Sequence, residues 1–194
     1  MVQEKIILIE CSLTKINKKM AYQKLQTREA LAVITSDDVR IPDPNTVVVL
    51  DTATGATVGA AAFNVANTLT DVGTEFLSAG ISTGAIVYNT TAGKAYHVVS
   101  VDSNTQITLS GSTAGGATDS YSIYTKPTIG CTLFVGTTGN VRVQMAQQNG
   151  NTSTAATPAN EAVTYKNIAD GSFLPIQVVR VDDNTTATDI IAMW

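Results

Sequence analysis

Runs of β-type residues, separated by turn signals, divide the middle of the chain into short strands rather than helices. The segments "AIVYN", "AYHVVSV", "QITLSG" and "YSIYT" follow one another from residue 85, with turn residues at roughly the 8–12-residue spacing of a small sandwich or barrel. Strands this short and close must pair antiparallel, because a parallel pair needs a long crossover connection. Beyond the N-terminal region no stretch has helical periodicity.

A second β-rich run begins after Lys126-Pro127, with strands expected at "CTLFVG", "VRVQM", "EAVTYKNI" and "FLPIQVVRV". In "VRVQM" the valines share one face of the strand and Arg142 and Gln144 share the other. Residues 147–160 contain no apolar anchor, so we expect a surface loop there.

The chain closes on "DIIAMW", in which residues 190–194 are apolar on both faces of a strand. A strand of this kind is covered on both sides. Burial contributes about 1.5–3 kcal/mol for each large side chain. Two interpretations stay open: the strand lies in the core of its own sandwich, or a neighbouring subunit covers it.

The N-terminal region is less regular. Residues 22–34 allow either one or two helical turns or an extended arm, and Pro42 and Pro44 favour extended geometry around them. A short strand is expected at 46–51. Residues 1–19 are either an extended start, since "MAYQKLQ" from Met20 itself reads like a natural beginning, or a flexible arm.

These patterns predict an all-β protein: an antiparallel, jelly-roll-like β-sandwich with an inserted small β-barrel or meander and an extended N-terminal arm. We expect the arm and its proline segment at 1–47, the inserted module at 48–126, and the sandwich module at 127–194, completed by 32–44.

Composition narrows the class of partner. The chain of 194 residues is 44% hydrophobic and 14% charged, with a net charge of −4, which is typical of a globular protein with an unusually uncharged surface. A net negative charge does not favour binding to the negatively charged phosphate backbone of nucleic acids. No apolar run approaches the ~20 residues of a membrane helix. We therefore expect neither nucleic acid nor membrane as a partner.

Residues that could carry chemistry are few. "GISTG" fits the nucleophile-elbow pattern around Ser82, but a strand rather than the required helix follows it, and no acid lies between Ser82 and the single histidine, His97. We expect a turn at Ser82 and a half-buried strand residue at His97. Two cysteines, Cys11 and Cys131, do not indicate a disulfide-stabilised fold, and we expect both thiols to be free.

Acidic residues gather near the C-terminus. "DDNTTATD" places Asp182, Asp183 and Asp189 in one polar stretch that could offer oxygens to calcium. The EF-hand spacing is absent, and turn formation explains Asp and Asn here equally well. We predict no metal, no cofactor and no catalytic site, because an enzyme would need a cluster of titratable groups that the sequence does not show.

The C-terminal third resembles a known module. "LFVGTTGNVRVQM", "EAVTYKNIADGSFLPIQVVRV" and "NTTATDIIAMW", with the upstream "AVITSDDVRIPDP", are similar to the head-spike base proteins of gene transfer agents and related tailed phages. The resemblance covers about residues 32–44 and 130–194. This chain departs from the family by a longer loop at 147–160 and by an insert of about 80 residues, in which "GAIVYNTTAGKAYHVVSVDSNTQITLS" is similar to a small β module common in phage structural proteins.

The resemblance implies a non-enzymatic virion structural protein of the head decoration or spike-base type. Such a protein is made in the host cytoplasm, assembles with itself into a closed trimer or pentamer, and docks on the major capsid protein at the surface of the phage head. The residues expected at interfaces are Phe173, Leu174, Ile190, Ile191, Met193 and Trp194, together with Ile41, Pro42 and Pro44.

An alternative is a receptor- or glycan-binding module of a tail or fibre. Tyr88, Tyr96, Tyr121 and Tyr124 lie in the inserted module and could line a surface on which sugars stack. Strand aromatics are more often part of a core, so burial of these four rings would remove that argument.

Overall fold

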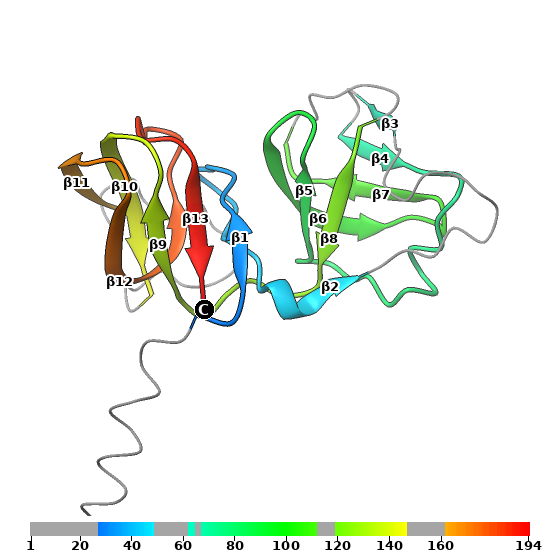
Figure 1. Ribbon diagram of the computed structural model, residues 1–194. Helices are drawn as coiled ribbons and strands as arrows, with labels where there is room; N and C mark the ends of the chain where they lie inside the picture. Colours follow the sequence, from blue (N-terminus) through cyan, green and yellow to red (C-terminus); the bar gives the residue numbers. More distant parts are fainter. Residues whose placement is uncertain (1–26, 49–61, 65–66, 112–118, 147–161) are drawn as a thin grey trace, which may run out of the picture.

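The computed structural model describes residues 27–48, 62–64, 67–111, 119–146 and 162–194. These residues form two antiparallel β-sheets (Figure 1). Within the described ranges there is no α-helix, hence none that could cross a membrane, and the one helical element is the 3-10 turn η2 (Pro44–Thr46). The predicted fold class, all-β and antiparallel with an inserted small β module, is confirmed.

The first sheet, here called the insert sheet, has the order β2-β8-β5-β6-β7-β4-β3. Its strands are β2 (Val47–Val48), β3 (Ala62–Asn64), β4 (Thr68–Thr70), β5 (Ile86–Asn89), β6 (Lys94–Val101), β7 (Gln106–Leu109) and β8 (Tyr121–Tyr124). Consecutive strands β5, β6 and β7 are neighbours, as expected of a meander. The expected strand at 46–51 is described only at β2.

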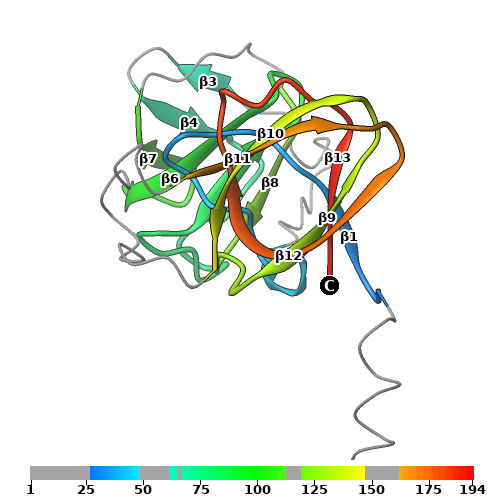
Figure 2. The same cartoon turned by 90° about the vertical axis from the view of Figure 1, so that its left-hand side faces the viewer.

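The second sheet, here called the terminal sheet, has the order β1-β13-β9-β12-β10-β11. Its strands are β1 (Ala30–Ala32), β9 (Cys131–Val135), β10 (Gly139–Met145), β11 (Val163–Ile168), β12 (Ser172–Val181) and β13 (Ile190–Met193). Figure 2 faces this sheet and shows β9, β10 and β12 curving around its interior. β12 lies between β9 and β10 and pairs with both, and its pairing with β9 has a register shift between Leu174 and Val178.

Each sheet encloses its own core. In the insert sheet Phe76, Leu69 and Ile107 are fully buried, and residues of β5, β6 and β8 complete the cluster. In the terminal sheet the core comes from alternate residues of β9, β10 and β12, with Ile190 and Ala192 of β13. Alternation places every second residue of a strand on one face, which is why these short runs each supply two or three core side chains.

The C-terminal strand lies inside its own sheet. β13 pairs with β9 on one side and with β1 on the other. Ile190 and Ala192 are buried in the core, whereas Ile191 and Met193 are half-buried on the opposite face. One face of the strand is therefore covered within the chain, as the first interpretation of "DIIAMW" predicts.

The segment that follows β1 is extended along the terminal sheet. The amide of Ser36 donates to Val181 and that of Ile41 to Val179, each at 2.9 Å. Pro42 forms an isolated bridge with Pro127. For residues 27–34 the extended alternative is therefore observed, because β1 completes the terminal sheet and no helical turn occurs there. The expectations for 1–19, for Cys11 and for the loop at 147–160 lie outside the described residues.

A third apolar cluster joins the two sheets. Val39 and the half-buried Leu31 and Ile34 come from β1 and the segment after it. They pack against the insert sheet, where the partners are Ile86 and Tyr88 of β5, Ala95 of β6 and Tyr124 of β8. β1 accordingly stands next to the insert sheet in Figure 1. This cluster is called the inter-sheet contact below.

Candidate functional site

An apolar row crosses four strands on the face of the terminal sheet that points away from its core. Ala32 is opposite Ile191, Ile191 is opposite Phe134, and Phe134 is opposite Phe173. Their chain neighbours Leu133, Ile190 and Ala192 are buried in the core, so the row itself points the other way. A second row beside it joins Ala30, Met193 and Thr132.

We call these seven residues the outer face: Ala30, Ala32, Thr132, Phe134, Phe173, Ile191 and Met193. Phe173 is 49% exposed. Phe134, Ile191, Met193 and Thr132 are half-buried. The members come from β1, β9, β12 and β13, so the face depends on the pairing of the first and last described strands, β1 and β13, with the middle of the sheet.

The outer face carries no charged side chain. Its apolar members and the Thr132 hydroxyl, which donates to the carbonyl of Met193 at 3.1 Å, leave no ionisable group among the seven. Asp189 precedes β13 and marks the margin, where its carboxylate accepts a hydrogen bond from Thr137 at 2.6 Å. Desolvating the face therefore costs little, because it buries neither a charge nor an unpaired polar group.

Of the nine residues expected at interfaces, Phe173, Ile191 and Met193 lie on the outer face. The others are placed differently. Ile41, Pro42 and Ile190 are buried within the chain, so their apolar side chains are already covered. Leu174 and Trp194 pack against the core of the terminal sheet, and Pro44 begins the η2 turn at the junction of the sheets.

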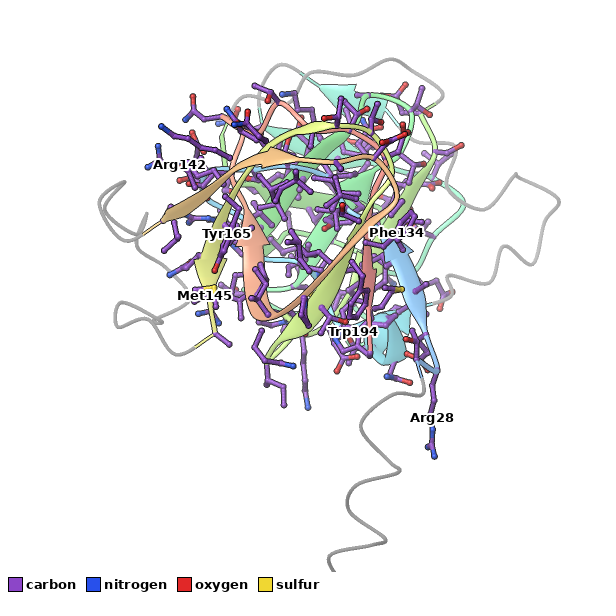
Figure 3. All side chains as sticks on the ribbon, turned by 60° about the vertical axis from the view of Figure 1, so that its left-hand side comes forward. Arg28, Phe134, Arg142, Met145, Tyr165 and Trp194 are labelled. Atoms are coloured by element: carbon purple, nitrogen blue, oxygen red, sulfur yellow. The ribbon has the colours of Figure 1, made fainter. Side chains whose placement is uncertain are left out.

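Phe134 was missed by the sequence analysis. It belongs to "CTLFVG", which reads as a strand but does not say which strands flank it. In the structure Phe134, which is labelled in Figure 3, is paired with Ile191 on one side and with Phe173 on the other. Phe134 alternates with Leu133 and Val135, which are buried in the core. This alternation was the signal in the sequence that could have placed Phe134 on the opposite face of the strand.

A buried charged group was also missed. Arg180 and Asp182 are each 3% exposed, and Nε of Arg180 lies 3.0 Å from the Asp182 carboxylate. Nε of Arg142 lies 3.1 Å from the other oxygen of the same carboxylate. Arg180 pairs with Gln144 on the face of β12 away from the core residue Val181, and it is buried there with Asp182, whereas Arg142 is partly exposed. We call Arg142, Arg180 and Asp182 the charge cluster.

The charge cluster accounts for Asp182 without a metal. Both oxygens of its carboxylate face arginines, which are positively charged donors that a calcium site does not contain. The amide of Asp183 donates to Asp37 at 3.1 Å, and Asp189 bonds to Thr137. Among the described residues no group of three or more His, Cys, Asp or Glu side chains could hold a metal ion.

Ser82 lies in a turn, as expected. The amide of Ala85 donates to the Ser82 carbonyl, and Gly80 and Gly84 have φ of 75° and 89°. Glycine adopts such angles without the steric penalty that a side chain imposes. β5, not a helix, follows, so the serine is not on a nucleophile elbow.

The four tyrosines proposed for sugar stacking are buried. Tyr88, Tyr96, Tyr121 and Tyr124 are only 2–8% exposed. Tyr96 and Tyr121 belong to the core of the insert sheet, and Tyr88 and Tyr124 belong to the inter-sheet contact with their rings 5.7 Å apart. They offer no open aromatic face, so the core position that is more usual for strand aromatics is confirmed, and the alternative of a stacking surface built from them is wrong.

Cys131 is free and buried in the core of the terminal sheet, as expected. Its thiol donates to the carbonyl of Val178 at 3.3 Å. Burial raises the pKa of this thiol to about 12. The side chain is therefore a neutral thiol at physiological pH, and it acts as a small apolar core residue rather than a nucleophile.

Neither a scan against protein-family models nor searches of curated proteins and of solved structures found a match for this chain.

Proposed function

We propose that this chain is a non-enzymatic structural protein of a phage virion, of the head decoration or spike-base type. It assembles with copies of itself and docks on the capsid shell. Two lines of evidence support this. One is the sequence resemblance of residues 32–44 and 130–194, and the other is the outer face of the terminal sheet.

The observation that carries the self-assembly proposal is the uncharged outer face. One of its rows extends over four adjacent strands and ends at a half-exposed phenylalanine, Phe173, and the other extends over three of these strands. Contiguous exposed apolar surface bounded by polar groups is characteristic of interaction sites. Aromatic residues are also the side chains most enriched where proteins associate.

A second copy of this chain is the occupant that fits this face. In a closed ring with the outer faces turned toward the symmetry axis, the same residues of each copy come close together. Like charges would repel in that position, but none of the seven residues is charged. Phe173 and Ile191 then meet their equivalents in an apolar contact.

Mass spectrometry of purified phage particles tests the virion assignment. Particles produced by a strain that encodes this chain should contain it at the stoichiometry of a ring on each docking site. Shells stripped of it should rebind the purified full chain. Absence of the chain from particles, or its presence only in trace amounts, would contradict the assignment.

A further inference from the structure

We propose that His97 is a proton-sensitive element of the inter-sheet contact, so that its protonation weakens the packing of the insert sheet against β1 and the segment after it. This inference does not rest on the virion assignment. It concerns how the two sheets of one chain hold together.

The register of the insert sheet places His97 on the contact face. Ile86 pairs with Tyr124 on one side and with His97 on the other, so the three side chains form one row. Ile86 and Tyr124 both belong to the inter-sheet contact. Their alternates Val87 and Ile123 point into the core of the insert sheet instead.

The imidazole of His97 reaches the opposing segment. Its Nε2 lies 3.4 Å from the backbone carbonyl of Asp38, a residue next to Val39 of the contact. Its Nδ1 is buried and has no hydrogen-bond partner among the described residues. A proton on that nitrogen would create a cation with one of its two N–H groups unsatisfied, which is costly in a desolvated position.

The charged groups that face His97 come from the same segment. The backbone carbonyl of Asp38 and then its carboxylate favour the protonated ring, whereas the Arg40 guanidinium opposes it. Tyr88 and Tyr124 share the contact face, and burial raises the pKa of both phenols, so they stay neutral. Burial of the imidazole is the largest influence, and with Arg40 it lowers the pKa of His97 below the ordinary value of 6.5.

The direction of the effect follows from this arrangement. With the sheets docked, His97 binds a proton less readily than it does when the contact opens and water reaches the ring. Docking is therefore at full strength above the ordinary histidine pKa and weakens as the pH falls below it. One group of this kind changes the docking equilibrium by at most about tenfold for each pH unit.

The chain suits a direct test, because it contains one histidine. In the full-length chain, NMR reports the titration of the His97 ring. The same samples report the NOEs that connect Leu31, Ile34 and Val39 with Ile86, Tyr88 and Tyr124. His97→Gln is the matched control, since the amide is neutral at every pH used and retains polar atoms of similar reach.

In the wild-type chain, the inter-sheet NOEs should be present at about pH 7.5 and lose intensity toward about pH 5, with a midpoint that coincides with the titration of His97. The His97→Gln chain should keep them throughout. NOEs that persist in the wild-type chain at the acidic limit, or a midpoint that differs from that of the His97 ring, would overturn the proposal. Equal loss in wild type and in a His97→Gln chain that is folded at about pH 7.5 would also overturn it; should that variant not fold, the wild-type midpoint alone decides.

Discussion

Phe134 and Phe173 stand opposite each other across the β9–β12 pair, and both project from the face of the terminal sheet that lies away from its core. On the other side of β9, Phe134 is opposite Ile191 of the C-terminal strand. The chain end is thus built into the middle of the sheet, and the same strand that closes the core with Ile190 and Ala192 supplies apolar side chains to the outside.

The charge cluster should be a large contributor to the stability of the terminal sheet. Replacing Asp182 with Asn removes the charge that the buried Arg180 and the partly exposed Arg142 face, and it leaves Arg180 as an uncompensated buried cation. We expect a loss of about 3 kcal/mol in the free energy of unfolding, measured by urea denaturation.

Asp183→Asn is the matched control for that measurement. Asp183 is adjacent but exposed, so the substitution should change the free energy of unfolding by less than about 0.5 kcal/mol. Similar losses in the two variants would show that the cluster is not the source of the effect.

The hydroxyl of Tyr121 should matter for the insert sheet. It donates to the carboxylate of Asp71 at 2.9 Å, and both residues are buried. Tyr121→Phe leaves one oxygen of a buried carboxylate without its donor, which should cost about 1–3 kcal/mol in thermal or chemical unfolding.

Tyr165→Phe provides the comparison. The Tyr165 hydroxyl is 3.9 Å from the Met145 sulfur, a weak acceptor, and the side chain is half-buried (both residues are labelled in Figure 3). Its loss should cost less than about 0.5 kcal/mol. A Tyr121→Phe protein as stable as wild type would show that the Asp71 contact contributes nothing.

Trp194 should anchor the C-terminal strand. Its ring packs against the core of the terminal sheet, and its indole nitrogen donates to Thr128 at 2.9 Å. Because the side chain is half-buried rather than fully buried, Trp194→Ala should cost about 2 kcal/mol, somewhat less than a core truncation.

Trp194→Phe separates the two contributions of that residue. It keeps most of the apolar contact and loses the hydrogen bond, so we expect a loss of about 1 kcal/mol. Circular dichroism is the suitable measurement, because both variants remove the single tryptophan of the chain and with it the fluorescence signal. Wild-type stability of Trp194→Ala would contradict the anchoring role.

The strands and their antiparallel pairing could be predicted from the sequence, because alternation and turn residues are local signals. "DIIAMW" also predicted a strand covered on both faces. One face is buried, with Ile190 and Ala192 in the core, whereas Ile191 and Met193 on the other face are half-buried. What local signals do not specify is which strands become neighbours. The pairing of Ala32 with Ile191 joins residues 159 positions apart, and no pattern within either strand indicates it.

The same limit explains the missed residues. Arg180 alternates with valines, which indicates a solvated face, yet the register brings it beside Gln144 and close to Arg142, where the Asp182 carboxylate stabilises buried charge. For the tyrosines, polar aromatic character in a strand was compatible with either surface or core. Tyr88 and Tyr124 are covered because Val39, from the segment after β1, packs against them, and this contact is not visible in the sequence.

Sedimentation of the full-length protein tests most directly whether the outer face brings copies of this chain together. Three chains are compared: wild type, Phe173→Asp, and Leu77→Asp. The last places the same charge on a residue of the insert sheet region that is 54% exposed, similar to the 49% of Phe173. Circular dichroism confirms that each chain is folded.

We predict that wild type and Leu77→Asp sediment as the same oligomer. Phe173→Asp should remain folded and sediment as a monomer, or require at least about tenfold higher concentration to associate, because each contact would bury an unpaired carboxylate. A wild-type chain that is monomeric at high concentration, or a Phe173→Asp chain that assembles like wild type, would contradict the account.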